Sequence, residues 1–137
     1  MGNSAFLNAI LKVKSNMDSG MFKPLQLAAT AALKLEDKWF DDLNEIYQQR
    51  RILAEAILKK LGCTFDEKQQ GLFIWAKLPP KLLSSANLID QLLNNYKIFL
   101  TPGFIFGTQG EGYIRISLCA TESQYRIALD RLQNFAL

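Results

Sequence analysis

The stretch that decides the fold is EDKWFDDLNEIYQQRRILAEAILKKL, residues 36–61, which Gly62 follows directly. Its apolar residues recur every three or four positions: Trp39, Leu43, Ile46, Tyr47, Leu53, Ile57 and Leu61. This spacing predicts an amphipathic helix of about seven turns, and Gly62 stands where a helix C-cap belongs. Acidic residues early in the stretch and Lys59 and Lys60 at its end suit the helix dipole. The charges therefore need no ligand to explain them.

Beyond this helix the apolar spacing becomes strand-like. The run GLFIWAKL, residues 71–78, is stopped by Pro79-Pro80 and predicts a strand covered on both faces. Helical spacing returns over residues 83–96, at Leu83, Ala86, Ile89, Leu92, Leu93 and Tyr96. A short strand at 98–100, an alternating strand at 113–118 and a helix over 121–135 complete the chain. The last helix is expected to bury Tyr125, Ala128, Leu129, Leu132 and Phe135.

Towards the amino terminus the pattern predicts two shorter helices. The first covers residues 4–14, and Asn3-Ser4 before it can cap its amino-terminal end. The stretch KSNMDSG, residues 14–20, is rich in residues that favour loops and is expected to end this helix. The second begins at Pro24, with small alanines on its packed side. We draw one boundary near Leu35, giving segments 1–35 and 36–137. The order of elements predicts an α+β fold. In it the long helix precedes a short sheet of about three strands, and helices cover that sheet.

Composition excludes several classes of chemistry. The chain has 137 residues and no histidine, so triads with a histidine base, Cys-His nucleophiles and histidine metal sites are ruled out, and we expect no metal. Its net charge of +3 is scattered, so we expect no nucleic-acid partner. We also expect no signal peptide and no membrane segment. Cys63 and Cys119 lie far apart and fit a reducing, cytoplasmic compartment.

Arg115 is the residue best suited to bind a ligand. It is the one charge inside an apolar strand, where Tyr113 and Ser117 share its face, and a guanidinium fork suits bidentate binding of a carboxylate. The alternative is a structural arginine that faces solvent or pairs with an acidic side chain. The glycine-rich stretch at 102–112 lacks a phosphate-binding ending, so we interpret it as a turn between strands, with Phe104 and Phe106 tucked inward. Trp39, Tyr47 and Trp75 are interpreted as core residues.

Several segments, taken in order, resemble the class I and II aminotransferases among the fold-type I pyridoxal phosphate enzymes. They are KSNMDSG at 14–20 with Gln26 and Ala28, Tyr47 with Arg50-Arg51, GLFIW at 71–75 with Leu78-Pro79, Pro102-Gly103 with Phe106-Gly107, and GEGYIRIS at 110–117. Together they span nearly the whole chain. The similarity is closest to bacterial aspartate and diaminopimelate aminotransferases.

The resemblance implies that this chain is a carboxy-terminal portion of such an enzyme. Residues 1–35 would be the last helices of the large, cofactor-binding domain, and residues 36–137 the interdomain helix and the small domain. The family's Schiff-base lysine precedes the first residue here, so no catalytic residue is assigned to this chain. Arg115 matches the arginine that grips the substrate's α-carboxylate. Asn16 and Ser19 match a segment that approaches the cofactor across the dimer.

The implied activity is transfer of an amino group between an amino acid and a 2-oxo acid by a homodimer. The fragment alone is expected to be inactive, without bound pyridoxal phosphate. It should expose apolar surface around Phe6, Leu7, Leu25 and Leu33, which favours self-association. Two alternatives remain: a related pyridoxal phosphate-dependent acyltransferase or lyase, and a stand-alone α+β interaction module without catalysis.

Overall fold

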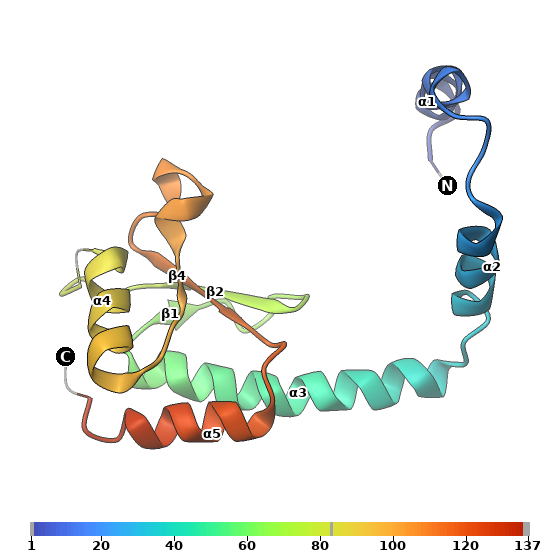
Figure 1. The fold of residues 1–137 in the computed structure, drawn as a ribbon. Coiled ribbons are helices and arrows are strands. Elements are labelled where there is room, and N and C mark those ends of the chain that lie inside the picture. The colour runs from blue at the N-terminus through green and yellow to red at the C-terminus, as the bar shows by residue number, and fades with distance from the viewer. Residues whose placement is uncertain (1, 83, 136–137) are drawn as a thin grey trace. The chain divides into compact units, whose positions relative to one another are not determined.

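The computed structural model describes residues 2–82 and 84–135, and it divides the chain into two compact units (Figure 1). The first unit is Met1–Phe40 and the second is Asp41–Leu137. Leu83, which we expected on the stripe of the fourth helix, lies outside the described residues.

The first unit consists of α1 (Ser4–Met17), α2 (Lys23–Ala32) and the first turn of a longer helix. The Asn3 side chain accepts a hydrogen bond from the Ala5 amide at 2.9 Å, as expected of a cap. Helix α1 runs three residues further than predicted, because the Ser15 and Asn16 side chains bond back to the Lys12 carbonyl inside the helix. Ser15 and Asn16 thus extend the helix instead of breaking it.

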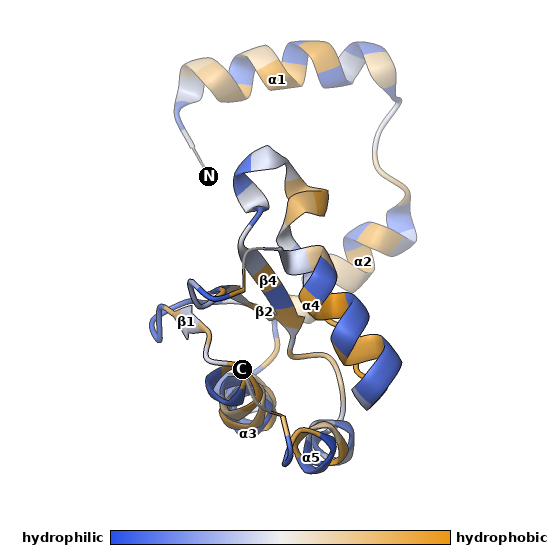
Figure 2. Ribbon diagram, turned by 90° about the vertical axis from the view of Figure 1, so that its left-hand side faces the viewer, coloured by the Kyte–Doolittle hydropathy of each residue, from blue (hydrophilic) through white to orange (hydrophobic). Residues whose placement is uncertain are grey.

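Both helices of this unit leave their apolar residues exposed, as predicted. Neither α1 nor α2 contains a buried residue, and the exposed fractions are 72% for Phe6 and 87% for Leu33. Figure 2 shows apolar and polar bands alternating along α1. An amphipathic helix with an uncovered apolar face gains little stability from packing.

The long helix α3 (Asp37–Lys60) confirms the central prediction and corrects one part of it. Gly62 has φ +71°, and the Cys63 amide bonds to the Leu58 carbonyl at 3.0 Å, which closes the helix as a glycine C-cap does. Ala54, Ile57 and Leu58 are buried, but Trp39 and Ile46, expected in the core, are about half exposed. Only the carboxy-terminal half of the stripe meets the sheet.

The sheet has four antiparallel strands in the order β1-β2-β4-β3: β1 (Thr64–Phe65), β2 (Phe73–Lys77), β4 (Tyr113–Ser117) and β3 (Thr101–Pro102). We expected about three strands. Strand β1 was missed because two residues show no alternation. The strand predicted at 98–100 is wrong: Ile98 and Leu100 are buried, but the ladder to β4 forms one step later, at Thr101 and Pro102.

The helices cover one face of this sheet. Ile74, Ala76, Ile114 and Ile116 are buried and form one core with residues of α3, α4 (Ser85–Gln91) and α5 (Glu122–Arg131). Figures 1 and 2 both show α3 and α5 side by side beneath the sheet. Coverage of residues 71–78 on both faces is therefore wrong for the described part of the chain. The outer face carries Phe73, Trp75, Tyr113 and Arg115.

Two helix ends depart from the predicted boundaries. Helix α4 passes into a π-helical turn, η1 (Leu92–Tyr96), which Lys97 ends in a left-handed conformation with φ +55°. Leu93, expected on the packed side of this helix, is 44% exposed. Helix α5 starts with a capping box between Thr121 and Gln124 and ends at Arg131, four residues early. Leu132 and Phe135 still reach the core through the turns that follow, and Tyr125 is buried as predicted.

Glu111 ties the glycine-rich loop to α4. Its Oε1 accepts hydrogen bonds from the Ser85 amide at 2.8 Å, the Ser85 hydroxyl at 3.1 Å and the Gly112 amide at 3.2 Å. These bonds, with the Ser85 amide first, lower the pKa of the Glu111 carboxyl below its ordinary value of 4.5. The ionised form is thus stabilised in the folded state.

This contact gives a pH-dependent stability. A lowered folded-state pKa adds stability above the unfolded pKa, and that stability is lost as pH falls below about 4.5 towards the folded pKa. In urea unfolding as a function of pH, Glu111→Gln should be less stable than the parent at pH 7 and approach it at acid pH. The exposed Glu67→Gln is the matched control. An equal gap at pH 7 and pH 3 would contradict the assignment.

Candidate functional site

Arg115 lies at the centre of the sheet's outer face. It is the middle residue of β4 and pairs in register with Trp75 of β2 and Thr101 of β3. Ile114 and Ile116 on either side of it are buried, so strand alternation turns the Arg115 side chain away from the helices. This orientation was predicted, and the structure confirms it.

Two aromatic rings enclose the guanidinium. The Arg115 Cζ lies 4.1 Å from the centroid of the Phe73 ring and 4.5 Å from that of the Phe106 ring. Both distances are well within the range of cation–π attraction. Among the described residues Arg115 has no acidic partner, and its Nε is buried without a hydrogen-bond acceptor. The guanidinium thus contacts two aromatic rings and, among the described residues, has no counter-charge.

The loop that supplies Phe106 is built on a backbone contact between two glycines. It runs through the 3-10 turns η2 (Gly103–Phe106) and η3 (Thr108–Gly110). A Cβ on Gly103 would lie 2.1 Å from the Gly110 oxygen, and one on Gly110 would lie 2.1 Å from the Gly103 oxygen. The two segments touch with no room for a side chain.

Phe104 and Phe106 are not tucked inward, which corrects our expectation. Their exposed fractions are 43% and 51%. The Phe106 ring packs against the outer face instead, edge-on to Trp75 with a centroid separation of 5.7 Å. Trp75 in turn stacks on Tyr113 at 5.5 Å and 14°, so it belongs to the outer face and not to the core. The connection between β3 and β4 is a turn, as expected.

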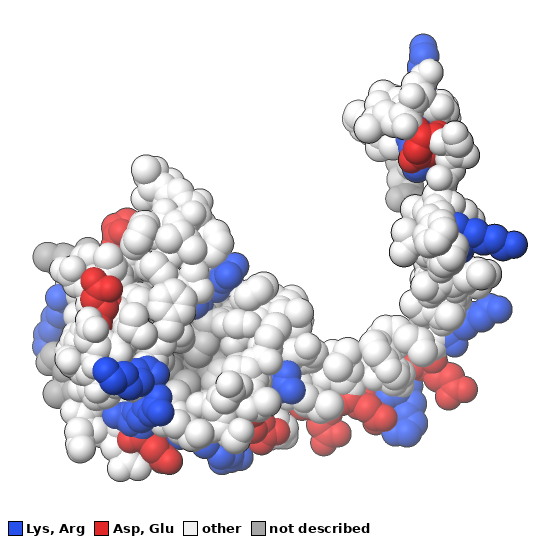
Figure 3. All heavy atoms as spheres, viewed as in Figure 1, with Lys and Arg blue, Asp and Glu red and all other residues white. Residues whose placement is uncertain are grey.

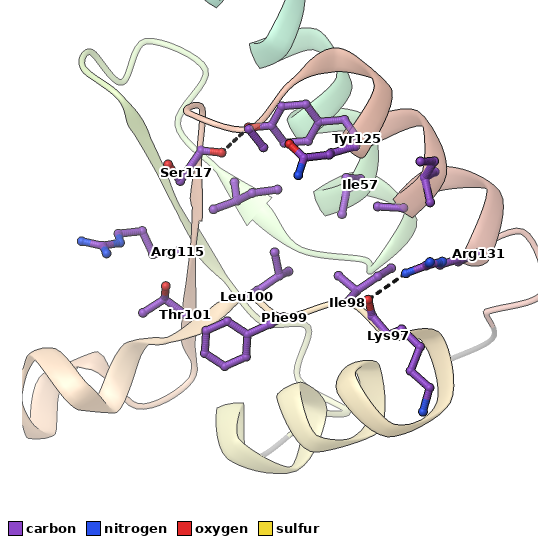
Figure 4. A pocket seen from close by; sticks show the side chains of 15 residues that line it. Ile57, Lys97, Ile98, Phe99, Leu100, Thr101, Arg115, Ser117, Tyr125 and Arg131 are labelled. Atoms are coloured by element: carbon purple, nitrogen blue, oxygen red, sulfur yellow. Dashed lines mark hydrogen bonds between the residues drawn. The ribbon is translucent and has the colours of Figure 1, made fainter.

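A cavity of about 540 Å³ lies beside β4. Its walls come from α3, α5, the segment 97–101 and residues 115–117 of β4. Figure 4 shows the Arg115 side chain pointing away from Ile57, Ile98 and Tyr125, which line the cavity. Burial raises the pKa of the Tyr125 phenol, whose hydroxyl donates to the Ser117 carbonyl. Arg115 lies at the edge of this cavity, and its guanidinium points away from it.

Asn16 and Ser19 lie in the first unit, at the end of α1 and just after it. The Asn16 amide donates to the Lys12 carbonyl at 2.7 Å, and Ser19 is exposed. Arg115 belongs to the second unit. Their role at a cofactor across a dimer stays a prediction.

The buried cysteine thiol is not a reactive nucleophile. Burial raises the pKa of the Cys63 thiol to about 11, so it stays protonated at neutral pH. The described residues hold no group of three or more His, Cys, Asp or Glu suited to a metal ion. In the same part of the chain, no helix is both long and apolar enough to cross a membrane. Basic and acidic side chains are interspersed on the face shown in Figure 3.

Sequence reasoning found Arg115 but missed its two aromatic neighbours. Strand alternation could have shown Phe73, because it shares the outer face with Trp75, the register partner of Arg115. No local pattern points to Phe106, since its position depends on how the loop folds back through Gly103 and Gly110.

Three comparisons with known proteins agree. The profile of the family described as "Aminotransferase class I and II" matches residues 1–132. An LL-diaminopimelate aminotransferase of Nitratidesulfovibrio vulgaris is 38% identical over 134 residues, which cover 98% of this chain and 34% of that protein. The solved structure of an aminotransferase from Staphylococcus aureus matches with a TM-score of 0.80 and 31% identity, over 96% of this chain and 35% of that one. BacF from Bacillus subtilis, solved in its apo form, gives a TM-score of 0.79 and 29% identity over 100% of this chain and 35% of that one.

Proposed function

Since the chain belongs to the class I and II aminotransferase family, we propose that it is the carboxy-terminal part of a pyridoxal phosphate-dependent aminotransferase. The enzyme would transfer an amino group between an amino acid and a 2-oxo acid. The chain spans about a third of the length of the curated relatives that it matches. Most of such an enzyme would therefore lie outside these 137 residues.

The observation that carries the proposal is the state of Arg115. A cation that contacts two aromatic rings and has no acidic partner among the described residues is suited to an external anion. Its planar fork can donate two parallel hydrogen bonds to a carboxylate. We assign to it the α-carboxylate of the amino acid and of the 2-oxo acid, since both substrates carry that group.

We assign no complete cradle for pyridoxal phosphate to the described residues of a single chain. Lys12, Lys14 and Lys23 lie on exposed helices, and the Asn16 amide is used inside α1. Pyridoxal phosphate, when bound, serves as the electron sink of amino transfer. We assign its lysine and ring-holding groups to the rest of the longer protein, and no step of the reaction to the chain's lysines.

The finer assignments rest on the relatives. Several of them, 33–38% identical, are named LL-diaminopimelate aminotransferases, which supports a role in amino acid biosynthesis. We propose a homodimeric, cytoplasmic enzyme. The exposed apolar faces of α1 and α2 support an association, and two free cysteines support a reducing compartment. The family match argues against a stand-alone interaction module. The similar structure named an aminotransferase argues against an acyltransferase or lyase.

Cofactor binding tests this division of labour. The 137-residue chain, mixed with pyridoxal phosphate and dialysed, should retain no visible Schiff-base absorbance, because weak imines on surface lysines wash away. The longer protein should retain it and transfer amino groups to 2-oxoglutarate from a mixture of amino acids. Absorbance that survives dialysis of the short chain, or a longer protein without transferase activity, would contradict the proposal.

A further inference from the structure

We propose that Phe106 is a positioning residue for the carboxylate clamp: the glycine-anchored loop 102–112 holds its ring over the guanidinium of Arg115 and fixes the plane in which a carboxylate can bind. This inference rests on the proposed function, because it concerns the same arginine. It adds a role for a loop that composition alone suggests to be a simple turn.

Two rings crowd the Arg115 guanidinium. Its Cζ lies over the Phe73 ring, 4.1 Å from the centroid, and over the Phe106 ring, 4.5 Å from the centroid, so a carboxylate cannot occupy the space that these rings fill. The Nε is buried, so a carboxylate must bind at the Nη atoms. A planar fork whose plane is fixed before binding loses less side-chain entropy when the two hydrogen bonds form.

The sheet holds one of the two rings and the glycine-anchored loop holds the other. Phe73 is fixed because it is a residue of β2 and pairs with Ser117 in the sheet. Phe106 lies outside the sheet, and two contacts fix it: its edge-on contact with Trp75 and the backbone contact between Gly103 and Gly110. Trp75 also approaches Gly103, with Cη2 3.0 Å from the position of a Cβ. The loop, the tryptophan and the arginine therefore form one packed cluster on the outer face.

A second phenylalanine of the same loop, Phe104, does not contact the arginine. Phe104 lies two residues before Phe106, has a similar exposed fraction and makes no ring or cation contact among the described residues. A phenylalanine that served only to bury apolar area would have no reason to face a cation. Phe104→Leu is therefore a matched control for Phe106→Leu.

The experiment measures the motion of the arginine directly, in the 137-residue chain. The ¹⁵N relaxation order parameter of the Arg115 Nε–Hε bond should be near the rigid limit of about 0.85 in the parent and fall below about 0.6 in Phe106→Leu. Phe106→Tyr should restore it, and Phe104→Leu should leave it unchanged. An order parameter that does not respond to Phe106→Leu, or that responds equally to Phe104→Leu, would overturn the inference.

The consequence for binding is measured in the longer aminotransferase. Loss of one cation–π contact should weaken kcat/KM by about 3- to 30-fold in Phe106→Leu, mostly through KM, with rescue by Phe106→Tyr. If Arg115→Lys lowers kcat/KM while Phe106→Leu does not, the positioning role is wrong and the proposed function stands. If neither variant changes kcat/KM, both are wrong.

Discussion

If the proposed function is right, replacing Arg115 with lysine is expected to lower the kcat/KM of the longer protein by at least about 10-fold while its stability hardly changes. Lysine keeps the positive charge but loses the planar fork, so one of two parallel hydrogen bonds to the carboxylate is lost. A hydrogen bond to a charged group contributes about 1.5–3 kcal/mol, which corresponds to at least a tenfold change in rate.

Stability should be nearly unaffected because Arg115 contributes little to the core. Its neighbours Ile114 and Ile116 provide the buried contacts of β4, and no hydrogen bond of the Arg115 side chain is found among the described residues. A lysine ammonium can still contact the Phe73 and Phe106 rings. Arg126→Lys, on the exposed side of α5 in an i,i+4 pair with Glu122, is the matched control. A large fall in melting temperature with unchanged kinetics would identify Arg115 as a structural residue instead.

Replacing Gly103 with alanine is expected to destabilise the second unit and to weaken the clamp at the same time. The new Cβ would lie 2.1 Å from the Gly110 oxygen and 2.8 Å from the Tyr113 oxygen, both backbone atoms that cannot rotate away. Overpacking of this kind costs about 1–3 kcal/mol of unfolding free energy. The loop must shift to relieve it, and Phe106 is part of that loop.

Urea unfolding of the 137-residue chain and kcat/KM of the longer protein measure the two effects. Ile105→Ala is the matched control, since Ile105 is exposed in the same turn and its truncation should change stability by no more than about 0.5 kcal/mol. A Gly103→Ala variant as stable and as active as the parent would show that the two glycines do not need to touch.

The spacing of apolar residues along the sequence predicts where helices and strands form and which way their side chains point. The 3.6-residue stripe and Gly62 predict α3, and alternation at 113–118 predicts which way Arg115 points. The same patterns cannot say what covers a stripe, so Trp39 and Ile46 were expected in the core and are about half exposed. A strand of two residues, such as β1, depends on its partner rather than on its own sequence.

At the candidate site, too, the sequence predicts one part and tertiary contacts determine the rest. Residue type and strand context identify Arg115, but its environment depends on contacts that are not local. Phe106 reaches the arginine because the loop folds back on itself, and the close approach of Gly103 and Gly110 becomes visible only in three dimensions. Glycine residues at both positions are compatible with many turns, so sequence alone could not select this one.

The measurement that tests the central claim most directly is the intact mass of the native protein. An antibody against the 137-residue chain can recover that protein from its source organism for mass spectrometry. We predict a single polypeptide about three times the length of this chain, because relatives match it over only 34% of their own length. Recovery of a 15.5 kDa polypeptide with no second chain bound to it would contradict the account.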